Sequence, residues 1–436
     1  MGVEENFPCS FDRISGEVLD LILARLPVTT LLTAGQVCKD WSALIRSRRF
    51  IEFYDKVALR KSWFFQCCVN YLCPSKNQGY GYEPETKKWH LISSQCFPTD
   101  RGNAFAGSPD GCLYSIFSLT DLSYKRELLS NLWERAPAMH NSRNSPLLGL
   151  VESESESSSA TDLKSHKLIV AGGVSFFEED DLAVEIYDSS LGSWELCQSL
   201  PVEFRGNCSR HWMTSAIAKG KFYIAEKYSG SIAVLDSDTK AWSSVKTLRP
   251  PGVVHSHLLS CQGRLLLAGS CYVNDSHSFK IWEVNEETME CGPILASMPS
   301  ELLSSCFDAG EDGQERKGEG LQCVAYGDLI YVFFPIYFRE LTRDNQVVVC
   351  DLSSRSSVSW TLLPPLPATA SYNHVVGLTS PVKLEFLVRQ HKEEETTPFS
   401  SPGRESEMSI EIQEFQRLMG HFKAFTRKRI GDLQRD

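Results

Sequence analysis

The sequence lacks the motifs that mark the common classes of enzyme and membrane protein. It contains no HExxH, GxSxG, Walker or GxGxxG motif, and GYGY at 79–82 lacks the third glycine of a dinucleotide-binding turn. Its longest apolar run, residues 329–338, includes Pro335 and is far shorter than the roughly 20 residues of a membrane-spanning helix. We therefore expect no enzymatic activity of the chain's own and no membrane span.

Excess positive charge and paired cysteines are also missing. The net charge of −11 provides no basic field for general nucleic-acid binding. The 15 cysteines include no CxxC pair, and several, such as Cys261, Cys323 and Cys350, lie in apolar runs, which predicts reduced, buried thiols. The N-terminal MGVEENF has neither the basic nor the apolar region of a secretory signal. We expect a protein of the cytoplasm and/or nucleus, with no metal and no other cofactor.

What the sequence does contain is a repeat. YDSSLGSW at 187–194 is echoed by YEPETKKW at 82–89, by LDSDTKAW at 235–242 and, more weakly, by VNEETMEC at 284–291. Asp188, Asp236 and Asn285 can accept a hydrogen bond from the backbone two residues on and so start a tight reversal. The large residue before the turn and the Trp after it then lie on neighbouring antiparallel strands, where such pairs stabilise a sheet.

Apolar strand-like segments at matching positions extend this hairpin to a larger unit. They are KLIVAGGV (167–174), KFYIAEKY (221–228), RLLLAGSC (264–271) and DLIYVFFP (328–335). The units span 63–92, 102–135, 146–201, 210–250, 255–299 and 321–367. This spacing predicts a mainly β fold, a β-propeller of six blades. Residues 372–380 can supply the innermost strand of the first unit and close the ring, 382–388 leave room for a seventh blade, and an unrelated sandwich is the alternative.

The first part of the chain follows a helical period instead. One predicted helix carries an apolar face and stops before Pro27, a second follows Thr29 or Thr30, and a third carries another apolar stripe. The two apolar faces consist of Val18, Leu19, Ile22, Leu23 and Leu26, and of Val37, Cys38, Trp41, Leu44 and Ile45. Residues 10–55 therefore predict a small three-helix domain, which either packs on the propeller as a cap or binds a partner.

Both parts resemble known families. AGG at 171–173, followed by Tyr187, Asp188 and Trp194, resembles a kelch repeat. ISGEVLDLILARLPVTTLLTAGQVCKDWSALIRSRRF at 14–50 resembles an F-box, with Ile14-Ser15 in place of the family's usual Leu-Pro. The resemblance divides the chain into a flexible N-terminus (1–9), an F-box domain (10–55), a kelch β-propeller (56–390) and a tail with a candidate amphipathic helix (391–436).

The combination of F-box and kelch repeats, common in plants, implies a role in ubiquitination. Such a protein is a non-catalytic substrate-recognition adaptor of an SCF-type cullin-RING ubiquitin ligase. Its F-box binds a Skp-type adaptor, which links it to the cullin and the RING subunit, and its propeller holds the protein to be ubiquitinated. The alternative is an interaction scaffold that binds a partner through the kelch propeller without recruiting a cullin.

The resemblance also selects residues for the contact with the Skp-type adaptor. These are Ile14, Leu26, Pro27, Leu31, Leu32, Val37, Cys38 and Trp41. Pro27 and Leu31 are the preferred interface residues, whereas Trp41 is expected in the core of the F-box itself.

Basic and amide residues recur in the predicted connections between blades. They are Arg101, Arg143, Arg205, Arg210, His211, Arg249, His255, His257, Asn373 and His374. Such loops gather at one end of the central channel, and the guanidinium fork of Arg suits carboxylate or phosphate. These residues are predicted to bind an acidic or phosphorylated substrate segment. The alternative is that each Arg is bonded to backbone carbonyls of the adjacent blade and holds the ring together.

Overall fold

The computed structural model of the chain describes most of its first 388 residues. The described residues are 16–57, 62–70, 73–92, 104–108, 111–116, 120–125, 132–152, 165–174, 180–274, 276–307, 321–334, 346–354, 358–367, 374–385 and 387–388. Residues 1–388 form one compact unit and 389–436 a second. The predicted N-terminal segment 1–9 and the tail with its candidate helix lie outside the described residues. No described helix is long and apolar enough to cross a membrane.

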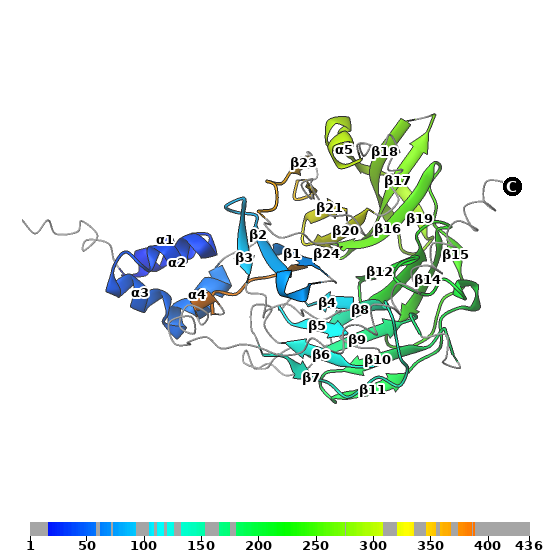
Figure 1. Cartoon of the computed structure of the whole chain (residues 1–436), viewed down its shortest axis with the longest axis horizontal. Coiled ribbons are helices and arrows are strands. Elements are labelled where there is room, and N and C mark those ends of the chain that lie inside the picture. The colour runs from blue at the N-terminus through cyan, green and yellow to red at the C-terminus, as the bar shows by residue number, and fades with distance from the viewer. Residues whose placement is uncertain are drawn as a thin grey trace, which may run out of the picture. The chain divides into compact units, whose positions relative to one another are not determined.

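The described strands form six sheets of four antiparallel strands each (Figure 1). The first consists of β24 (His374–Ser380), β1 (Trp63–Val69), β2 (Gln78–Glu83) and β3 (Lys88–Ile92). The second consists of β4 (Ala104–Gly107), β5 (Leu113–Ile116), β6 (Leu122–Lys125) and β7 (Glu134–Arg135). The third consists of β8 (Leu147–Glu152), β9 (His166–Ala171), β10 (Val184–Asp188) and β11 (Ser193–Leu196).

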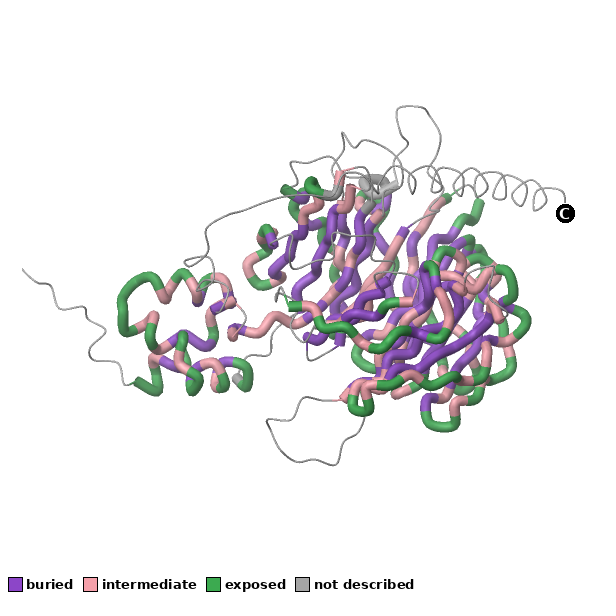
Figure 2. Tube along the Cα trace, turned by 60° about the horizontal axis from the view of Figure 1, so that its bottom comes forward, coloured by how far each residue is buried: buried purple, intermediate pink, exposed green. Residues whose placement is uncertain are grey.

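The other three sheets follow in chain order. They are β12 (Met213–Ala218), β13 (Lys221–Glu226), β14 (Ser231–Asp236) and β15 (Lys246–Thr247); β16 (Val253–Cys261), β17 (Arg264–Val273), β18 (Ser276–Asn285) and β19 (Glu290–Ser297); and β20 (Gln322–Tyr326), β21 (Leu329–Phe333), β22 (Val347–Asp351) and β23 (Ser359–Leu362). Buried residues follow the strands, and exposed residues gather at the turns (Figure 2). The prediction of a six-bladed propeller is confirmed, and we number the blades 1 to 6 in this order.

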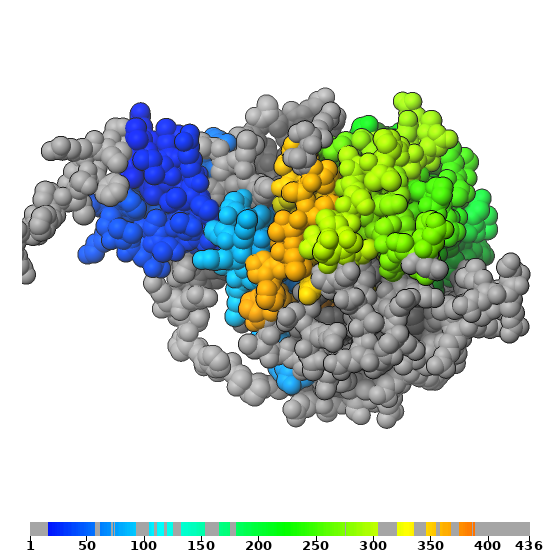
Figure 3. All heavy atoms as spheres, turned by 90° about the horizontal axis from the view of Figure 1, so that it is seen from above, coloured from blue at the N-terminus to red at the C-terminus, as the bar shows by residue number. Residues whose placement is uncertain are grey.

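The last strand closes the ring. β24 pairs with β1 from Trp63↔Ser380 to Val69↔His374, so blade 1 takes its innermost strand from the far end of the propeller sequence, as residues 372–380 predict. In Figure 3 the light blue residues of blade 1 lie directly beside the orange residues near the end of the described chain. The inner strands of neighbouring blades also contact one another, and the Thr379 hydroxyl donates a hydrogen bond to the Ala325 carbonyl at 3.4 Å. Closure leaves no blade at an open end of the ring.

Residues 382–388 form no seventh blade. Their described part adds no strand, and Leu384 and Val388 are buried against the N-terminal helices. The apolar residues of this segment therefore pack in the core of the N-terminal helices and not in a further blade.

The repeated hairpin has the predicted pairing. Tyr187 lies directly opposite Trp194 and Tyr82 opposite Trp89, with ring centroids 5.2 and 5.3 Å apart. Leu235 and Trp242 form the same pair as an isolated bridge. Asp188 Oδ1 accepts a hydrogen bond from the backbone N–H of Ser190 at 2.8 Å, which confirms the predicted turn.

The Trp of this hairpin also joins neighbouring blades. The indole Nε1 of Trp89 donates to the Pro364 carbonyl at 2.8 Å, and that of Trp194 donates to the Pro137 carbonyl at 2.7 Å. Trp242 makes the equivalent bond to the Gln198 carbonyl at 3.0 Å. Each carbonyl belongs to the segment that follows the preceding blade, so the repeat stabilises the ring as well as the blade.

The N-terminal helices are α1 (Gly16–Ala24), α2 (Val28–Ala34), α3 (Lys39–Ile45) and α4 (Arg48–Val57). The prediction of three helices misses α4, whose Arg49 lies 2.5 Å from Asp20 of α1. The structure also describes helix α5 (Ser300–Phe307) and the short 3₁₀ helices η2 (Pro74–Lys76) and η4 (Val202–Phe204).

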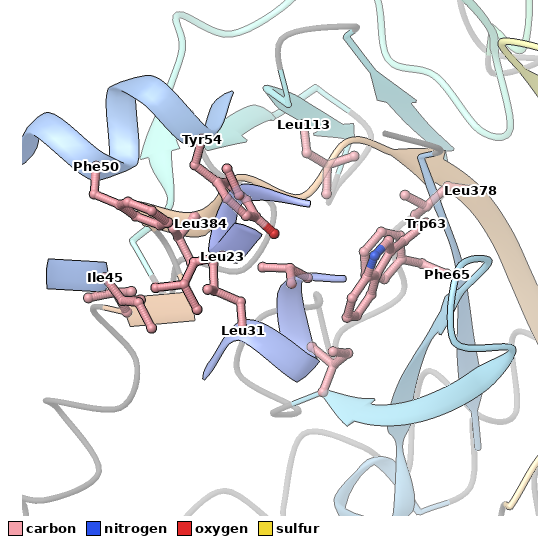
Figure 4. Close-up of a cluster of buried hydrophobic side chains, with 14 of the residues drawn as sticks. Leu23, Leu31, Ile45, Phe50, Tyr54, Trp63, Phe65, Leu113, Leu378 and Leu384 are labelled. Carbon is pink, nitrogen blue, oxygen red and sulfur yellow. The ribbon is translucent and has the colours of Figure 1, made fainter. Parts of the chain in front are cut away.

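The N-terminal helices share their core with blade 1 and with the segment that follows β24, the last strand of the propeller. Figure 4 shows Leu384 among the side chains of Leu23, Phe50 and Tyr54, and the same cluster continues to Trp63 and neighbouring blade residues. Leu384 itself is fully buried. The helices therefore do not complete a core by themselves, because a residue more than three hundred positions away in the chain fills part of it.

Candidate functional site

Helix α1 presents an apolar face to solvent. Val18, Leu21 and Ile22 are 46%, 42% and 46% exposed, whereas Leu23 and Ala24 on the other side of the helix are buried. The spacing of three and four residues places the three exposed side chains in one stripe. A single exposed aliphatic residue is ordinary, but a stripe of three on one short helix is typical of an interaction surface.

The loop between α2 and α3 adds one more exposed apolar residue to the three on α1. Val37 is 70% exposed, and Cys38 is exposed while its Sγ accepts the backbone N–H of Trp41 at 3.5 Å and caps α3. Leu26, Pro27, Leu32 and Trp41 are partly buried, and Ile14 lies outside the described residues.

Leu31 corrects the adaptor-binding prediction. The F-box resemblance favours Leu31 as an interface residue, but its side chain is 0% exposed and belongs to the core that the helices share with Leu384. Packing from a distant segment therefore converts a sequence-predicted contact residue into a core residue. Val18 and Leu21, which the prediction omitted, are exposed in its place.

Glu83 at the end of β2 holds α2 against blade 1. Its carboxylate is buried and accepts hydrogen bonds from the Thr29 hydroxyl at 2.5 Å and the Thr86 hydroxyl at 2.6 Å, and the Thr29 N–H lies at 3.4 Å. His90 Nε2 lies 3.3 Å from the same carboxylate. Burial tends to raise the pKa of Glu83, but the contacts with His90, Thr29 and Thr86 lower it to about 2. The helices are thus fixed to the propeller by a buried anion as well as by apolar packing.

Arg143 is a second correction, because it is not available to a substrate. Its side chain is 0% exposed, and its guanidinium lies 2.8 Å from Glu185 and donates to the carbonyls of Gly172 and Ala183 at 2.8 and 2.9 Å. Burial tends to raise the pKa of Glu185, but hydrogen bonding and charge from Arg143 lower it. Arg143 therefore follows the alternative prediction, in which the Arg holds the propeller together: it joins the segment before β8 to strand β10.

His255 and His257 are a third correction. They lie within β16 rather than in a connection between blades, and they are only 4% and 7% exposed. Their ring centroids are 4.7 Å apart, and His257 Nε2 is 2.6 Å from the Leu321 carbonyl at the start of blade 6. Burial, reinforced by the charge of Lys227, lowers the pKa of His255 to about 3, so the ring is neutral at physiological pH. Among the described residues no cluster of His, Cys, Asp and Glu could hold a metal ion.

The remaining predicted substrate residues differ in their surroundings. Arg205 lies 3.7 Å from Asp181, and Arg249 donates from Nε to the Val253 carbonyl at 3.1 Å. Arg210 is half-buried and His211 is exposed. Arg101 and Asn373 lie outside the described residues, and His374 begins β24 opposite Val69.

Known proteins are similar to this chain both in its N-terminal helices and over most of its length. The F-box domain profile matches residues 11–53, which include α1, α2, α3 and the exposed stripe. F-box/kelch-repeat protein At1g23390 of Arabidopsis thaliana is 25% identical in an alignment of 373 residues, and the match covers 83% of this chain and 87% of the relative. The chain thus contains an F-box domain and is similar to F-box/kelch-repeat proteins over most of its length.

Other relatives are more distant. F-box/kelch-repeat protein At5g42360 of A. thaliana is 22% identical in an alignment of 352 residues, and the match covers 62% of this chain and 61% of the relative. Protein UNUSUAL FLORAL ORGANS of A. thaliana is 22% identical in an alignment of 388 residues, and the match covers 83% of this chain and 80% of the relative. A solved structure of U3-55K matches 66% of this chain and 75% of its own at 13% identity, with a TM-score of 0.36. The F-box domain and the F-box/kelch relatives support the general role of a substrate-recognition adaptor, and proteins of this family are typically non-catalytic.

Three residues that matter for these surfaces are not predicted from the sequence. The predicted apolar faces do not include Leu21, although its spacing of three residues from Val18 places the two on one side of a helix. Glu83 lies in a repeated turn and is indistinguishable in sequence from the acidic turn residues of the other blades. Leu384 lies in an apolar run that reads as a strand.

Proposed function

We propose that this F-box/kelch protein is the substrate-recognition subunit of an SCF-type cullin-RING ubiquitin ligase. Its F-box binds a Skp-type adaptor, which recruits the cullin and the RING subunit, and its propeller holds the protein to be ubiquitinated. The observation that carries the proposal is the exposed stripe of Val18, Leu21 and Ile22, which lies inside the matched F-box on helices anchored to a closed propeller.

The mechanism is one of proximity. The chain contributes no reacting group in this proposal: it raises the effective concentration of the substrate near the ligase by binding both. That concentration depends on how rigidly the two binding surfaces are connected. Glu83 and Leu384 provide the connection, because one bonds α2 to blade 1 and the other places the end of the propeller inside the helical core.

The test is co-purification of the full chain with a Skp-type adaptor and a cullin. The full chain is required because the helices take Leu384 into their core. Ile22→Lys places a charge in the exposed stripe without disturbing buried residues, and Val202→Lys does the same at a propeller position that is 67% exposed. We expect Ile22→Lys to lose adaptor and cullin, and Val202→Lys to retain both.

The result also decides between the two functions that the sequence left open. Capture of the adaptor together with the cullin supports the ligase subunit. Capture of the adaptor without the cullin by a folded chain favours the interaction scaffold. Equal capture by Ile22→Lys and the unmodified chain would show that the α1 stripe is not the adaptor surface.

A further inference from the structure

Rings from blades 4 and 5 form a continuous row at the end of the channel where the inner strands begin. Trp212 precedes β12, Tyr228 follows β13, and His255 lies near the start of β16. The ring centroids of Trp212 and Tyr228 are 5.9 Å apart, and those of Tyr228 and His255 are 5.1 Å apart. Since Met213 pairs with Glu226, residues on both sides of this hairpin reach the same end of the ring.

Large side chains are also exposed at this end of blade 5. Tyr228, Tyr272 and Val273 are 38%, 41% and 48% exposed. Val273 lies against Gly252, where an added Cβ would be 2.4 Å from its methyl group, and the Tyr272 N–H donates to the Gly252 carbonyl at 2.9 Å. Because Cys271 near the end of β17 pairs with Val253 at the start of β16, the tip of the β17–β18 hairpin lies at the same end of the ring as Tyr228.

Two cations border this surface without a carboxylate partner among the described residues. Lys227 donates from Nζ to the Arg210 and His211 carbonyls at 2.8 and 3.4 Å, and its electrostatic neighbours are Arg210 and Cys323. Burial, followed by the charge of Arg210, lowers the pKa of Lys227 to about 8, which leaves it mainly protonated at neutral pH.

Nearby acidic groups are already engaged. Glu226, next to Lys227 in the sequence, accepts hydrogen bonds from Asn207 and Ser229. Asp181 lies 3.7 Å from Arg205 instead. The chain has a net charge of −11, so two adjacent cations with no carboxylate beside them in the described part of the chain are a local reversal of sign. An anion bound there would relieve their repulsion.

We propose that this surface, defined by Arg210, Trp212, Lys227, Tyr228, Tyr272 and Val273, binds a peptide segment in which an Asp or Glu is adjacent to an aromatic or large aliphatic residue. This inference rests on the proposed function, because the segment belongs to the protein that the propeller captures. The guanidinium of Arg210 pairs with the carboxylate of the segment, while its apolar neighbour packs on Tyr228 and Val273. The assignment narrows the predicted substrate surface: it keeps Arg210 and excludes the buried Arg143 and His257.

A carboxylate fits the donors better than a phosphate does. The Lys227 ammonium group already donates to two backbone carbonyls, so few of its three N–H donors remain for a ligand. Arg210 supplies a fork that matches one carboxylate in a bidentate geometry. The partial burial of Arg210 strengthens such a pair relative to one on open surface.

The test is fluorescence anisotropy of labelled short peptides with the purified full chain. Four peptides differ only at two adjacent central positions, which are Glu-Phe, Gln-Phe, Glu-Ser and phosphoserine-Phe. The protein variants are Arg210→Gln and Tyr228→Ala. Their matched controls are Arg135→Gln, an exposed Arg on the outer strand β7, and Leu196→Ala, which is 56% exposed on the outer strand β11.

We expect the Glu-Phe peptide to bind, and the Gln-Phe and Glu-Ser peptides to bind about tenfold more weakly, as for the loss of one dominant interface contact. Arg210→Gln should weaken Glu-Phe binding to the same extent while leaving Gln-Phe binding unchanged, because the contact it removes is already absent there. Tyr228→Ala should weaken binding of the Glu-Phe and Gln-Phe peptides, and neither control variant should change any affinity.

Four results would overturn the inference: no binding by any peptide, equal binding of Glu-Phe and Gln-Phe, unchanged affinities in Arg210→Gln and Tyr228→Ala, or binding of the phosphoserine peptide alone. Adaptor and cullin capture is measured on the same protein samples. Capture without peptide binding contradicts only the peptide surface, whereas peptide binding without capture contradicts only the ligase proposal.

Discussion

Replacing Glu83 by Gln should detach the F-box helices from the propeller without a change of side-chain size. The Glu83 carboxylate is 0% exposed and is bonded to Thr29 and Thr86, with His90 nearby. These contacts lower its pKa from 4.5 to about 2, although burial acts in the opposite direction. Since one pKa unit corresponds to about 1.4 kcal/mol, the folded state favours the charged form by about 3 kcal/mol.

The sign of the pH dependence follows from the lowered pKa. The contribution of Glu83 is fully present above the unfolded pKa of 4.5 and is lost as the pH falls toward 2. Gln at this position has no charge to lose. The difference between the unmodified chain and Glu83→Gln should therefore be about 2–3 kcal/mol at neutral pH and should shrink as the pH falls below 4.5.

Two measurements examine this prediction. Urea unfolding gives the difference in the free energy of unfolding at neutral and acidic pH, and hydrogen exchange of α2 reports the local release of the helices. Glu290→Gln, at an exposed position of the outer strand β19, is the matched control and should change neither. Equal stability of Glu83→Gln and the unmodified chain at neutral pH, or a difference that does not shrink in acid, would refute the assigned role of the carboxylate.

Two further predictions concern residues that join distant parts of the chain. Leu384→Ala removes a fully buried side chain from the helical core and should cost about 2–5 kcal/mol of stability. We expect faster hydrogen exchange in α1 and α4 and weaker capture of the adaptor. The control Leu362→Ala, at a position that is 38% exposed, should behave like the unmodified chain. Arg143→Met leaves the buried Glu185 without its cation and should cost about 3–5 kcal/mol of stability. The double variant Arg143→Met with Glu185→Leu should recover part of that loss in thermal unfolding. A double variant less stable than both Arg143→Met and Glu185→Leu alone would contradict the pairing.

The sequence by itself determined the repeated architecture. Tyr187, the Asp188 turn and Trp194 lie within eight residues of one another, so the hairpin they form depends on local chain geometry and cross-strand packing. Their recurrence at regular intervals led to six blades and to the closing strand, because each unit can bury its faces only against the next. The F-box was recognisable for a similar reason, since its pattern is continuous in the chain.

Only the tertiary structure decided which members of that pattern are available to partners. Leu31 and Val37 both matched the F-box pattern, yet one is buried and the other is 70% exposed. Arg143 and Arg210 are both basic residues of blade connections, but only Arg143 meets a buried Glu185. Burial and ion pairing depend on segments that are distant in the chain and adjacent in space, and the period of a sequence carries no information about them.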